Sequence, residues 1–551
     1  MKVRCGIVTS RITYSVCTLL SAGKAGLARR LPRLVLVLAA CLAFSLPFKL
    51  AAAQSCIQID RIQLDGVTVF DAALLEAELP IGCLSFADLN ALLEAVTLTY
   101  TNAGYVAARA YLPEQDLADG ELTIVVIEGT LADIELRENG VPAPRRAATA
   151  FPGMQGRPLQ LRRLEQGLSQ INRLPSSEAV SELRPGDGAG ESVLVVDVTQ
   201  ANPWRASVSL DDRGSATTGY QNLALTVSVD NPLGVNDQWL LSYQRSSDPG
   251  PIAFLPQSPL GRSLSLSGSL PYGNWTFALA LSASDYVTDI PGVTGPIESG
   301  GNSASARLTA DRVLSVNEAR RWDTGASLTV KENEQQILGT TIDTASRRLS
   351  LFEAWLSRSQ VLWGGQSQSR LALRYGLDAF GALDDGRAAA GAPKAQYRAA
   401  LFDFSWGRQW DLDGQLNVLS TSLSSFYSDD ALFGSEQIAI GGFNSVRGMR
   451  TSLLFGNRGA QVITNLSFPE LFANEAATVS LTPYWGFDAG YIQEQEALEI
   501  DEGHLSSWTF GTTLAHKELQ IEAVQSQVLR ATSGLGFPHA GILSLQARLA
   551  F

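Results

Sequence analysis

From residue 203 to the end of the chain, apolar and polar residues alternate in one segment after another. The two-residue period is clear in the segments 204–210, 223–229, 275–281, 402–406 and 543–551. Successive side chains of a β-strand point to opposite faces, so each of these segments would have one apolar face. Strands of about ten residues, joined alternately by short turns and long loops, are typical of a barrel that spans an outer membrane.

A soluble β-sandwich would show the same alternation, but two other features favour the membrane barrel. The chain begins with an export signal, and its last residue, Phe551, closes an alternating apolar segment. We expect about sixteen antiparallel strands over residues 203–551, and an even number leaves both ends of the barrel on the periplasmic side. The expected fold is therefore an all-β transmembrane barrel preceded by two small α+β domains.

Residues 1–53 have the layout of a signal peptide. Arginines and lysines come first, Leu34–Pro47 is an apolar core, and Ala51–Ala53 offers small residues for cleavage. The core is short for a spanning helix. A single-spanning anchor is one alternative. A lipoprotein site at Cys41 is another, although it would leave an apolar stub on the mature chain. We expect export and cleavage near Ala53.

Cysteine usage fits an exported protein. Cleavage near Ala53 removes three of the five cysteines and leaves Cys56 and Cys83. An even pair in an oxidising compartment indicates a disulfide that closes a loop of about 27 residues, with a stabilisation of roughly 3 kcal/mol. Metal binding is the competing interpretation. It is disfavoured because no Cys-x-x-Cys is present and all three histidines lie in the last tenth of the chain.

Residues 57–200 contain one β-α-α-β-β unit twice. The first copy has strand patterns at 57–64, 107–112 and 122–127 and helical patterns at 70–79 and 87–100. The second copy has strand patterns at 132–136, 179–183 and 193–198 and helical patterns at 145–151 and 159–174. We assign residues 54–130 and 131–202 to two domains in tandem.

One loop has the wrong composition for a membrane strand. Residues 441–450 hold three glycines and two arginines and lack an apolar run. Further on, the strand pattern of 479–490 places Asp488 on the face opposite Trp485 and Phe487. Asp488 would then point into the barrel. Arg447 can pair with it only if the loop folds back into the lumen, where a bidentate pair would hold it. An ordinary solvated turn is the alternative for this loop.

At these positions the chain resembles outer-membrane transporters of the two-partner secretion type. Val446, Arg447, Gly448 and Met449 resemble the Val-Arg-Gly-aromatic tip of a loop, with Met449 in place of the usual aromatic residue. Phe487, Asp488 and Gly490 resemble the strand motif that partners this tip. Residues 104–129, flanked by Cys56 and Cys83, resemble a polypeptide-transport-associated (POTRA) domain of the haemolysin-activator kind. Phe551 resembles the signal that barrel strands present to the assembly machinery.

The resemblance implies a function in export. The two POTRA domains would capture a large exoprotein in the periplasm by adding it as a strand, and the barrel would export it. The other expected partners are outer-membrane lipid and, during biogenesis, the assembly machinery. Many relatives carry an N-terminal plug helix and a Pro-rich linker. Here Ile57 starts the first strand so close to the cleavage site that we expect neither.

Other functions fit the sequence less well. The net charge of −13 argues against nucleic acid as a partner. The sequence lacks the nucleophile elbow, phosphate loop, zinc-protease and dinucleotide motifs, so we expect no enzyme activity, no cofactor and no metal. A passive porin has no use for two periplasmic domains. A general factor for outer-membrane protein assembly shares the architecture and stays open as the alternative.

Overall fold

The computed structural model describes residues 56–551 apart from 215–218, 248–260, 451–453, 475–477, 494–501 and 533–540 and the single positions 294, 318, 388, 390 and 470. The expected signal peptide therefore lies outside the described residues. Over the residues described, no helix is long and apolar enough to cross a bilayer.

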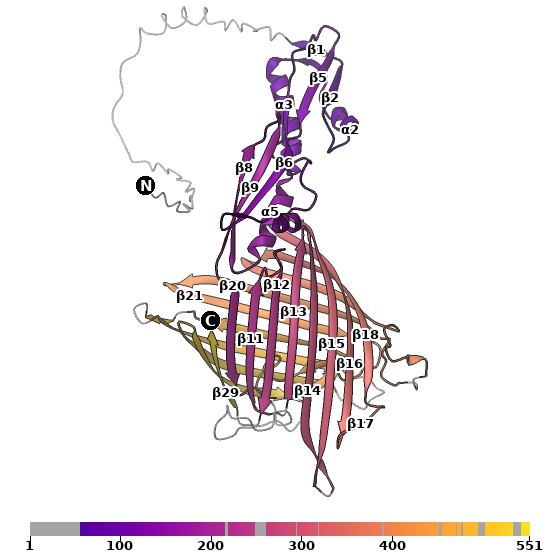
Figure 1. Cartoon of the computed structure of the whole chain (residues 1–551), viewed down its shortest axis with the longest axis vertical. Coiled ribbons are helices and arrows are strands. Elements are labelled where there is room, and N and C mark those ends of the chain that lie inside the picture. Colours follow the sequence, from indigo (N-terminus) through magenta and orange to yellow (C-terminus); the bar gives the residue numbers. More distant parts are fainter. Residues whose placement is uncertain are drawn as a thin grey trace, which may run out of the picture. The chain divides into compact units, whose positions relative to one another are not determined.

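Residues from Trp204 onward form a closed antiparallel barrel (Figure 1). In the described part of the chain its wall has sixteen long strands, and two short ones, β17 (Thr340–Thr341) and β25 (Phe472–Asn474), pair with β16 and β26. The predicted barrel of about sixteen strands is confirmed. The long strands are β10 (Trp204–Asp211), β11 (Gln221–Asp230), β12 (Gln238–Ser247), β13 (Gly261–Tyr272), β14 (Trp275–Gly292), β15 (Gly295–Val316), β16 (Arg320–Ile337), β18 (Arg347–Leu362), β19 (Gly365–Leu377), β20 (Arg398–Leu412), β21 (Gln415–Tyr427), β24 (Arg458–Ser467), β26 (Val479–Gln493), β27 (Gly503–His516), β28 (Leu519–Ala531) and β29 (Ile542–Ala550).

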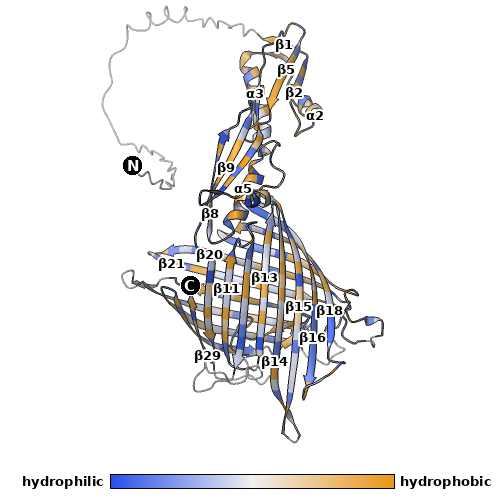
Figure 2. Ribbon diagram, viewed as in Figure 1, coloured by the Kyte–Doolittle hydropathy of each residue, from blue (hydrophilic) through white to orange (hydrophobic). Residues whose placement is uncertain are grey.

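The two faces of the wall differ as the alternation predicts. Figure 2 shows hydrophobic and hydrophilic residues alternating along the barrel strands. Leu225 and Val227 of β11 are exposed on the outer face, whereas Ser507 and Thr509 of β27 are buried on the inner face. An apolar outer face is what a wall in contact with lipid requires.

Several strands are longer than the ten residues expected. β14 has 18 residues, β15 has 22 and β16 has 18. A tilted strand crosses the bilayer in about ten residues, so the rest of these strands extends beyond it. Pairing continues through polar sequence because the ladder of hydrogen bonds joins main-chain groups and does not depend on an apolar side chain. Alternation therefore marks only the part of each strand that lies in the membrane.

The barrel closes between its first and last strands. β10 and β29 share five register pairs, against ten between β11 and β12, and theirs is the shortest ladder between neighbouring long strands over the residues described. Phe551 continues this ladder, because its N–H donates to the carbonyl of Ala206 at 2.8 Å and its carbonyl accepts from Ala206 at 3.2 Å. The C-terminal residue is thus part of the closing seam.

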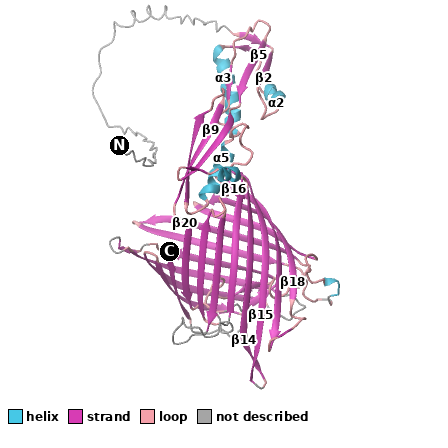
Figure 3. Ribbon diagram, viewed as in Figure 1, coloured by secondary structure: helices cyan, strands magenta, loops and turns pink. Residues whose placement is uncertain are grey.

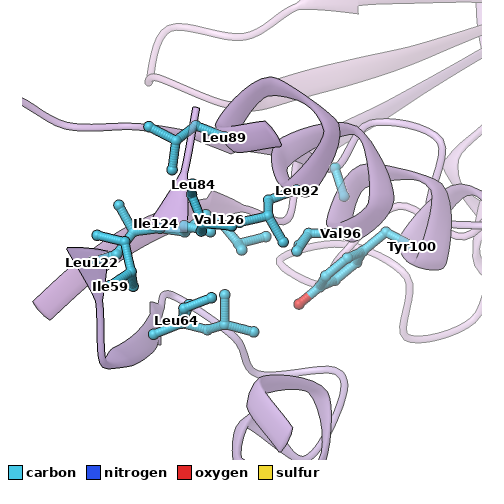
Figure 4. Packing of buried hydrophobic residues seen from close by; sticks show 12 residues of the cluster. Ile59, Leu64, Leu84, Leu89, Leu92, Val96, Tyr100, Leu122, Ile124 and Val126 are labelled. Atoms are coloured by element: carbon cyan, nitrogen blue, oxygen red, sulfur yellow. The ribbon is translucent and has the colours of Figure 1, made fainter. Parts of the chain in front are cut away.

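The first domain keeps the predicted β-α-α-β-β order with two differences: the predicted strand at 57–64 is divided into β1 and β2, and a short strand, β3, lies between the two helices and pairs with β1. Its three-stranded sheet is ordered β2-β5-β4, with β2 and β5 parallel. The helix α3 begins with a capping box between Ser85 and Asp88 and then buries Leu89, Leu92, Val96 and Tyr100 at spacings of three and four residues against the sheet (Figure 4). The elements are β1 (Ile57–Ile59), β2 (Arg61–Asp65), α2 (Ala72–Ala77), β3 (Gly82–Leu84), α3 (Phe86–Asn102), β4 (Arg109–Tyr111) and β5 (Glu121–Ile127).

The second domain repeats this arrangement (Figure 3). Its sheet is ordered β7-β6-β9-β8, again with the first and last main strands, β6 and β9, parallel. The strands β3 and β7 have only three and two residues, which is too short for an alternating pattern to be recognised in the sequence. The elements are β6 (Thr130–Glu138), β7 (Val141–Pro142), α4 (Pro144–Ala150), α5 (Leu161–Asn172), β8 (Ser177–Pro185) and β9 (Glu191–Gln200).

Candidate functional site

The loop between β21 and β24, of which residues 428–450 and 454–457 are described, folds back into the barrel. We call it the lumen loop. It contains a small hairpin of β22 (Ile438–Ile440) and β23 (Leu454–Gly456). Val446 and Met449 are buried and pack with Ile492, Leu505 and Val528 on the inner side of β26, β27 and β28. Met449 therefore fills an apolar contact at the position where the motif that it resembles has an aromatic residue.

Arg447 and Asp488 form a bidentate pair inside the barrel. The Nε and Nη2 atoms of Arg447 each lie 2.6 Å from an oxygen of Asp488, and the main-chain N–H of Arg447 donates to the same carboxylate at 3.1 Å. Arg447 is 8% exposed and Asp488 is not exposed. Asn465 accepts a further hydrogen bond from Nη2 at 2.8 Å, and Ser507 donates to Asp488 at 3.4 Å. Burial of this kind makes each charge dependent on the other.

Glycines give the loop the room it needs. A Cβ at Gly486 would collide with the guanidinium of Arg447. A Cβ at Gly490 would lie 2.6 Å from Ile440 and 3.0 Å from Val446. Gly448 has φ +102° and its Cβ would lie 2.9 Å from the main-chain nitrogen of Val528. The glycines of both motifs are thus explained by close approach of loop and wall.

A second arginine of the loop reaches the closing seam. Arg450 donates to the carbonyl of Asp212 at the end of β10, and its Nη2 lies 3.2 Å from the Asp212 carboxylate. The guanidinium also lies over the ring of Tyr220, 5.2 Å from its centroid. Asp212 in turn accepts a hydrogen bond from the main chain of Leu545 in β29 at 2.9 Å. Reasoning from the sequence missed this contact.

The seam has a polar reinforcement of its own. Arg213 crosses β29 and binds Glu522 of β28 at 2.7 Å, and on the way it donates to Gln546 at 3.0 Å. Tyr484 of β26 donates to the other oxygen of Glu522 at 2.9 Å. A continuous polar chain therefore runs from the strand that carries Asp488 to the seam.

The first part of the lumen loop is bound to a third region of the barrel wall, on β16. Glu436, which is 4% exposed, forms an ion pair with Lys331 of β16. The hydroxyl of Tyr397, which is fully buried, donates to Glu436 at 2.8 Å. The loop is thus bound to β16 by Glu436, to β26 by Arg447 and to β10 by Arg450.

The periplasmic domains carry the remaining sequence candidates. Cys56 and Cys83 are disulfide-bonded. Glu128 is 7% exposed and accepts hydrogen bonds from the main chains of Thr68 and Val69 at 2.6 and 2.8 Å and from Tyr100 at 2.9 Å. Burial raises the pKa of Glu128, but these donors outweigh it, so the net pKa is lowered. The carboxylate fixes the loop after β2 to the end of β5.

The second domain is bound to the turns of the barrel. Arg146 of α4 is 1% exposed and donates to Asn236, in the turn between β11 and β12, at 2.7 Å. Asn236 donates back to the carbonyl of Arg146 and to the hydroxyl of Thr149, both at 2.9 Å. Gly273, in the turn between β13 and β14, donates to the carbonyl of Thr149 at 2.8 Å. This end of the barrel is therefore the end that carries the domains.

Over the described residues, no group of three histidine, cysteine, aspartate or glutamate side chains is placed to hold a metal ion. The arrangement at the lumen is instead a set of ion pairs and apolar contacts that hold a loop in a channel.

Three comparisons identify relatives of this architecture. The family model "Haemolysin secretion/activation protein ShlB/FhaC/HecB" matches residues 190–514, and two POTRA models match residues 57–129 and 130–185. The outer membrane transporter CdiB of Dickeya dadantii is 32% identical over 467 residues, which cover 84% of this chain and 81% of the relative. The hemolysin transporter protein HpmB of Proteus mirabilis is 27% identical, over 88% of this chain and 82% of the relative.

A solved structure has the same fold. CdiB from Escherichia coli aligns with a TM-score of 0.80 at 28% identity and covers 93% of both chains. CdiB from Acinetobacter baumannii aligns with a TM-score of 0.73 at 19% identity, which supports the fold. These findings place the barrel in the outer membrane and the two POTRA domains in the periplasm. The chain belongs to the haemolysin secretion/activation protein family and is an outer-membrane transporter of two-partner secretion.

Proposed function

We propose that the lumen loop closes the pore of this transporter and that the Arg447–Asp488 pair holds it closed. The main support for this proposal is the bidentate contact between Arg447 of the loop and Asp488 of the wall. Both side chains are buried, and two nitrogen atoms of Arg447 each lie 2.6 Å from an oxygen of Asp488. Removal of one partner leaves the other charge buried and unpaired, which is energetically unfavourable, so the loop would no longer be held in the lumen by this contact. An exoprotein in transit would have to displace the same loop.

The second POTRA domain offers an edge where the exoprotein can bind. β8 pairs with β9 on one side, and over the residues described no strand pairs with its other side. It has nine residues, against three in β4, the corresponding edge of the first domain. Val180 is 66% exposed on it. An extended segment added to this edge would gain main-chain hydrogen bonds that depend little on its side chains.

The client in this proposal is a large unfolded exoprotein of the adhesin or haemolysin kind. Its folding outside the cell would supply the direction of transport. During biogenesis, the exposed Phe551 and its strand would be recognised by the assembly machinery, and the apolar outer face would bind outer-membrane lipid. A photo-crosslinker at Val180 should then capture the exoprotein, whereas one at Tyr111, which is 50% exposed on β4 at the edge of the first domain, should not. The reverse result would move the binding edge to the first domain.

The closure is tested by conductance and secretion together. We expect Arg447→Ala and Asp488→Ala each to raise the open probability of the purified protein in planar bilayers. We also expect each to lower secretion of the exoprotein client. Barrel migration on gels should stay heat-modifiable, because the strand ladder is untouched. Arg262 and Asp285 form an exposed ion pair on the barrel, so Arg262→Ala is the matched control.

The double variant Arg447→Ala/Asp488→Ala tests whether the contact between the two residues closes the pore. If the two residues act as one contact, the effects of the single changes are far from additive. Small, additive effects equal to those of Arg262→Ala would show that the pair is a feature of a wet wall and that another element closes the pore.

A further inference from the structure

Two arginines lie on the outer face of the barrel near the turns that carry the POTRA domains. Arg312 of β15 is the register partner of Trp275, and Arg358 of β18 is the register partner of Trp322. Register partners share a face, and the row that continues from Trp275 to the exposed Phe277 faces lipid. A cation on this face is costly at the middle of the membrane and tolerated near the headgroups.

Neither arginine has an acidic partner among the residues that the structure describes. The guanidinium of Arg312 lies over Trp275, 5.3 Å from the ring centroid, and that of Arg358 lies over Trp322 at 5.1 Å. A stacked guanidinium keeps the N–H groups along its edge free to donate. Both side chains are thus positioned as donors toward the membrane.

A hollow in the apolar wall lies beside Arg312. Its volume is about 530 Å³. The small residues Gly268, Ala310 and Ala326 line it together with the larger Phe277, Leu308 and Phe352. Ala310 lies two residues before Arg312 on the same face of β15, so about 7 Å separates the arginine from the hollow. An apolar chain in the hollow would therefore end next to a cation.

We propose that this surface binds one glycerophospholipid of the periplasmic leaflet. The phosphate of its headgroup accepts hydrogen bonds from the long side chains of Arg312 and Arg358, whose main chains lie two strands and two residues apart, or about 12 Å, and one acyl chain fills the hollow. Guanidinium donors match phosphate oxygens in geometry and charge, and tryptophan is favoured at the depth of the headgroups. The inference deepens the proposal that lipid is a partner, and its failure would leave the proposed closure untouched.

The test is native mass spectrometry of the full transporter released from nanodiscs that contain phosphatidylglycerol. We expect the wild type to retain one phospholipid. The double variant Arg312→Gln/Arg358→Gln should retain roughly tenfold less or lower, since a hydrogen bond to a charged group contributes at least that factor. Ala310→Phe, which fills the hollow and keeps both arginines, should lose the lipid as well. Heat-modifiable migration checks that each variant folds.

Arg408 of β20, an exposed arginine beside the turn at Gly364, is the matched control. Arg408→Gln should keep the lipid. Equal loss from Arg408→Gln would show that these arginines are general anchors at the headgroups, and full retention in the double variant would show that they bind no lipid. Displacement by millimolar inorganic phosphate would overturn the assignment of the acyl chain to the hollow. Each of these three results would reject the proposal.

Discussion

Asp212 at the end of β10 joins the lumen loop to the closing seam, because it binds Arg450 of the loop. The Nη2 atom of Arg450 lies 3.2 Å from one oxygen of Asp212, and the other oxygen accepts the N–H of Leu545 in β29 at 2.9 Å. The seam has only five register pairs. One carboxylate therefore couples the position of the loop to the shortest ladder between long strands in the described wall.

This coupling predicts an order of stability among variants. Asp212→Ala removes the carboxylate and with it the contacts to Arg450 and Leu545, whereas Arg450→Ala removes the first of these together with the hydrogen bond of Arg450 to the main-chain carbonyl of Asp212. We expect the temperature at which the barrel loses its folded migration on gels to fall more for Asp212→Ala. The double variant should lose less than the sum of the two single losses, because both changes remove the same ion pair. The ion pair is partly exposed and contributes about 1 kcal/mol or less. Fully additive losses would show that the two contacts are independent.

The orientation of the barrel predicts which positions can be labelled from outside the cell. Asp384 lies in the connection between β19 and β20, and Leu233 lies in the turn beside the second POTRA domain. Both are exposed. An impermeant maleimide on intact cells should label Asp384→Cys and leave Leu233→Cys unlabelled. Cys56 and Cys83 give no background because they are disulfide-bonded. The opposite labelling would show that the barrel has the reverse orientation in the membrane.

The fold was predictable because its periods are long and repeated. Alternation over many segments predicts strands whatever their order in space, and spacings of three and four residues predict α3. The lengths of β14 and β15 were not predictable, because the parts of these strands that extend beyond the bilayer do not need an apolar outer face and so do not alternate. The disulfide-bonded cysteines and the Arg447–Asp488 contact could be anticipated. Two cysteines in an exported chain indicate a disulfide, and a charged residue on the inner face of a barrel strand needs an oppositely charged partner.

The other contacts of the loop could not be read from the sequence. Arg450 and Asp212 are 238 positions apart, and neither lies in a period that marks it. Glu436 resembles any loop glutamate until Tyr397 is seen beside it. Gly486 did carry a signal: it lies two residues before Asp488 on the same inner face, where a missing side chain leaves room for an arginine.

Glu128 predicts how the first POTRA domain responds to acid. Its pKa is lowered in the folded protein, so its contribution is present above the unfolded pKa of about 4.3 and is lost as the pH falls through the lower folded value. Hydrogen exchange of residues 57–129 in the full chain should therefore show a loss of protection below about pH 4.5. Glu128→Gln should lose about 2 kcal/mol at pH 7 and respond less to acid. An unchanged acid response in Glu128→Gln would assign the effect to other carboxylates.

The contact of Arg146 with Asn236 predicts how firmly the second POTRA domain is held to the barrel. Asn236 has φ +59° and is fully buried, and its side chain makes three hydrogen bonds to α4. Asparagine tolerates this backbone conformation better than alanine, and glycine adopts it freely. Asn236→Gly therefore removes the hydrogen bonds without backbone strain, and Asn236→Ala removes them with it.

We expect both variants to free the domain, because each leaves the buried guanidinium of Arg146 with one acceptor fewer. At about 1 kcal/mol for each neutral hydrogen bond and more for the charged one, the loss is roughly 3 kcal/mol. Limited proteolysis of the full transporter should then cut near Ala201–Pro203, between β9 and β10, faster than in the wild type, with the barrel intact. Faster cutting in Asn236→Ala alone would mean that the turn conformation holds the domain, and the hydrogen bonds to Arg146 would then have no part in it.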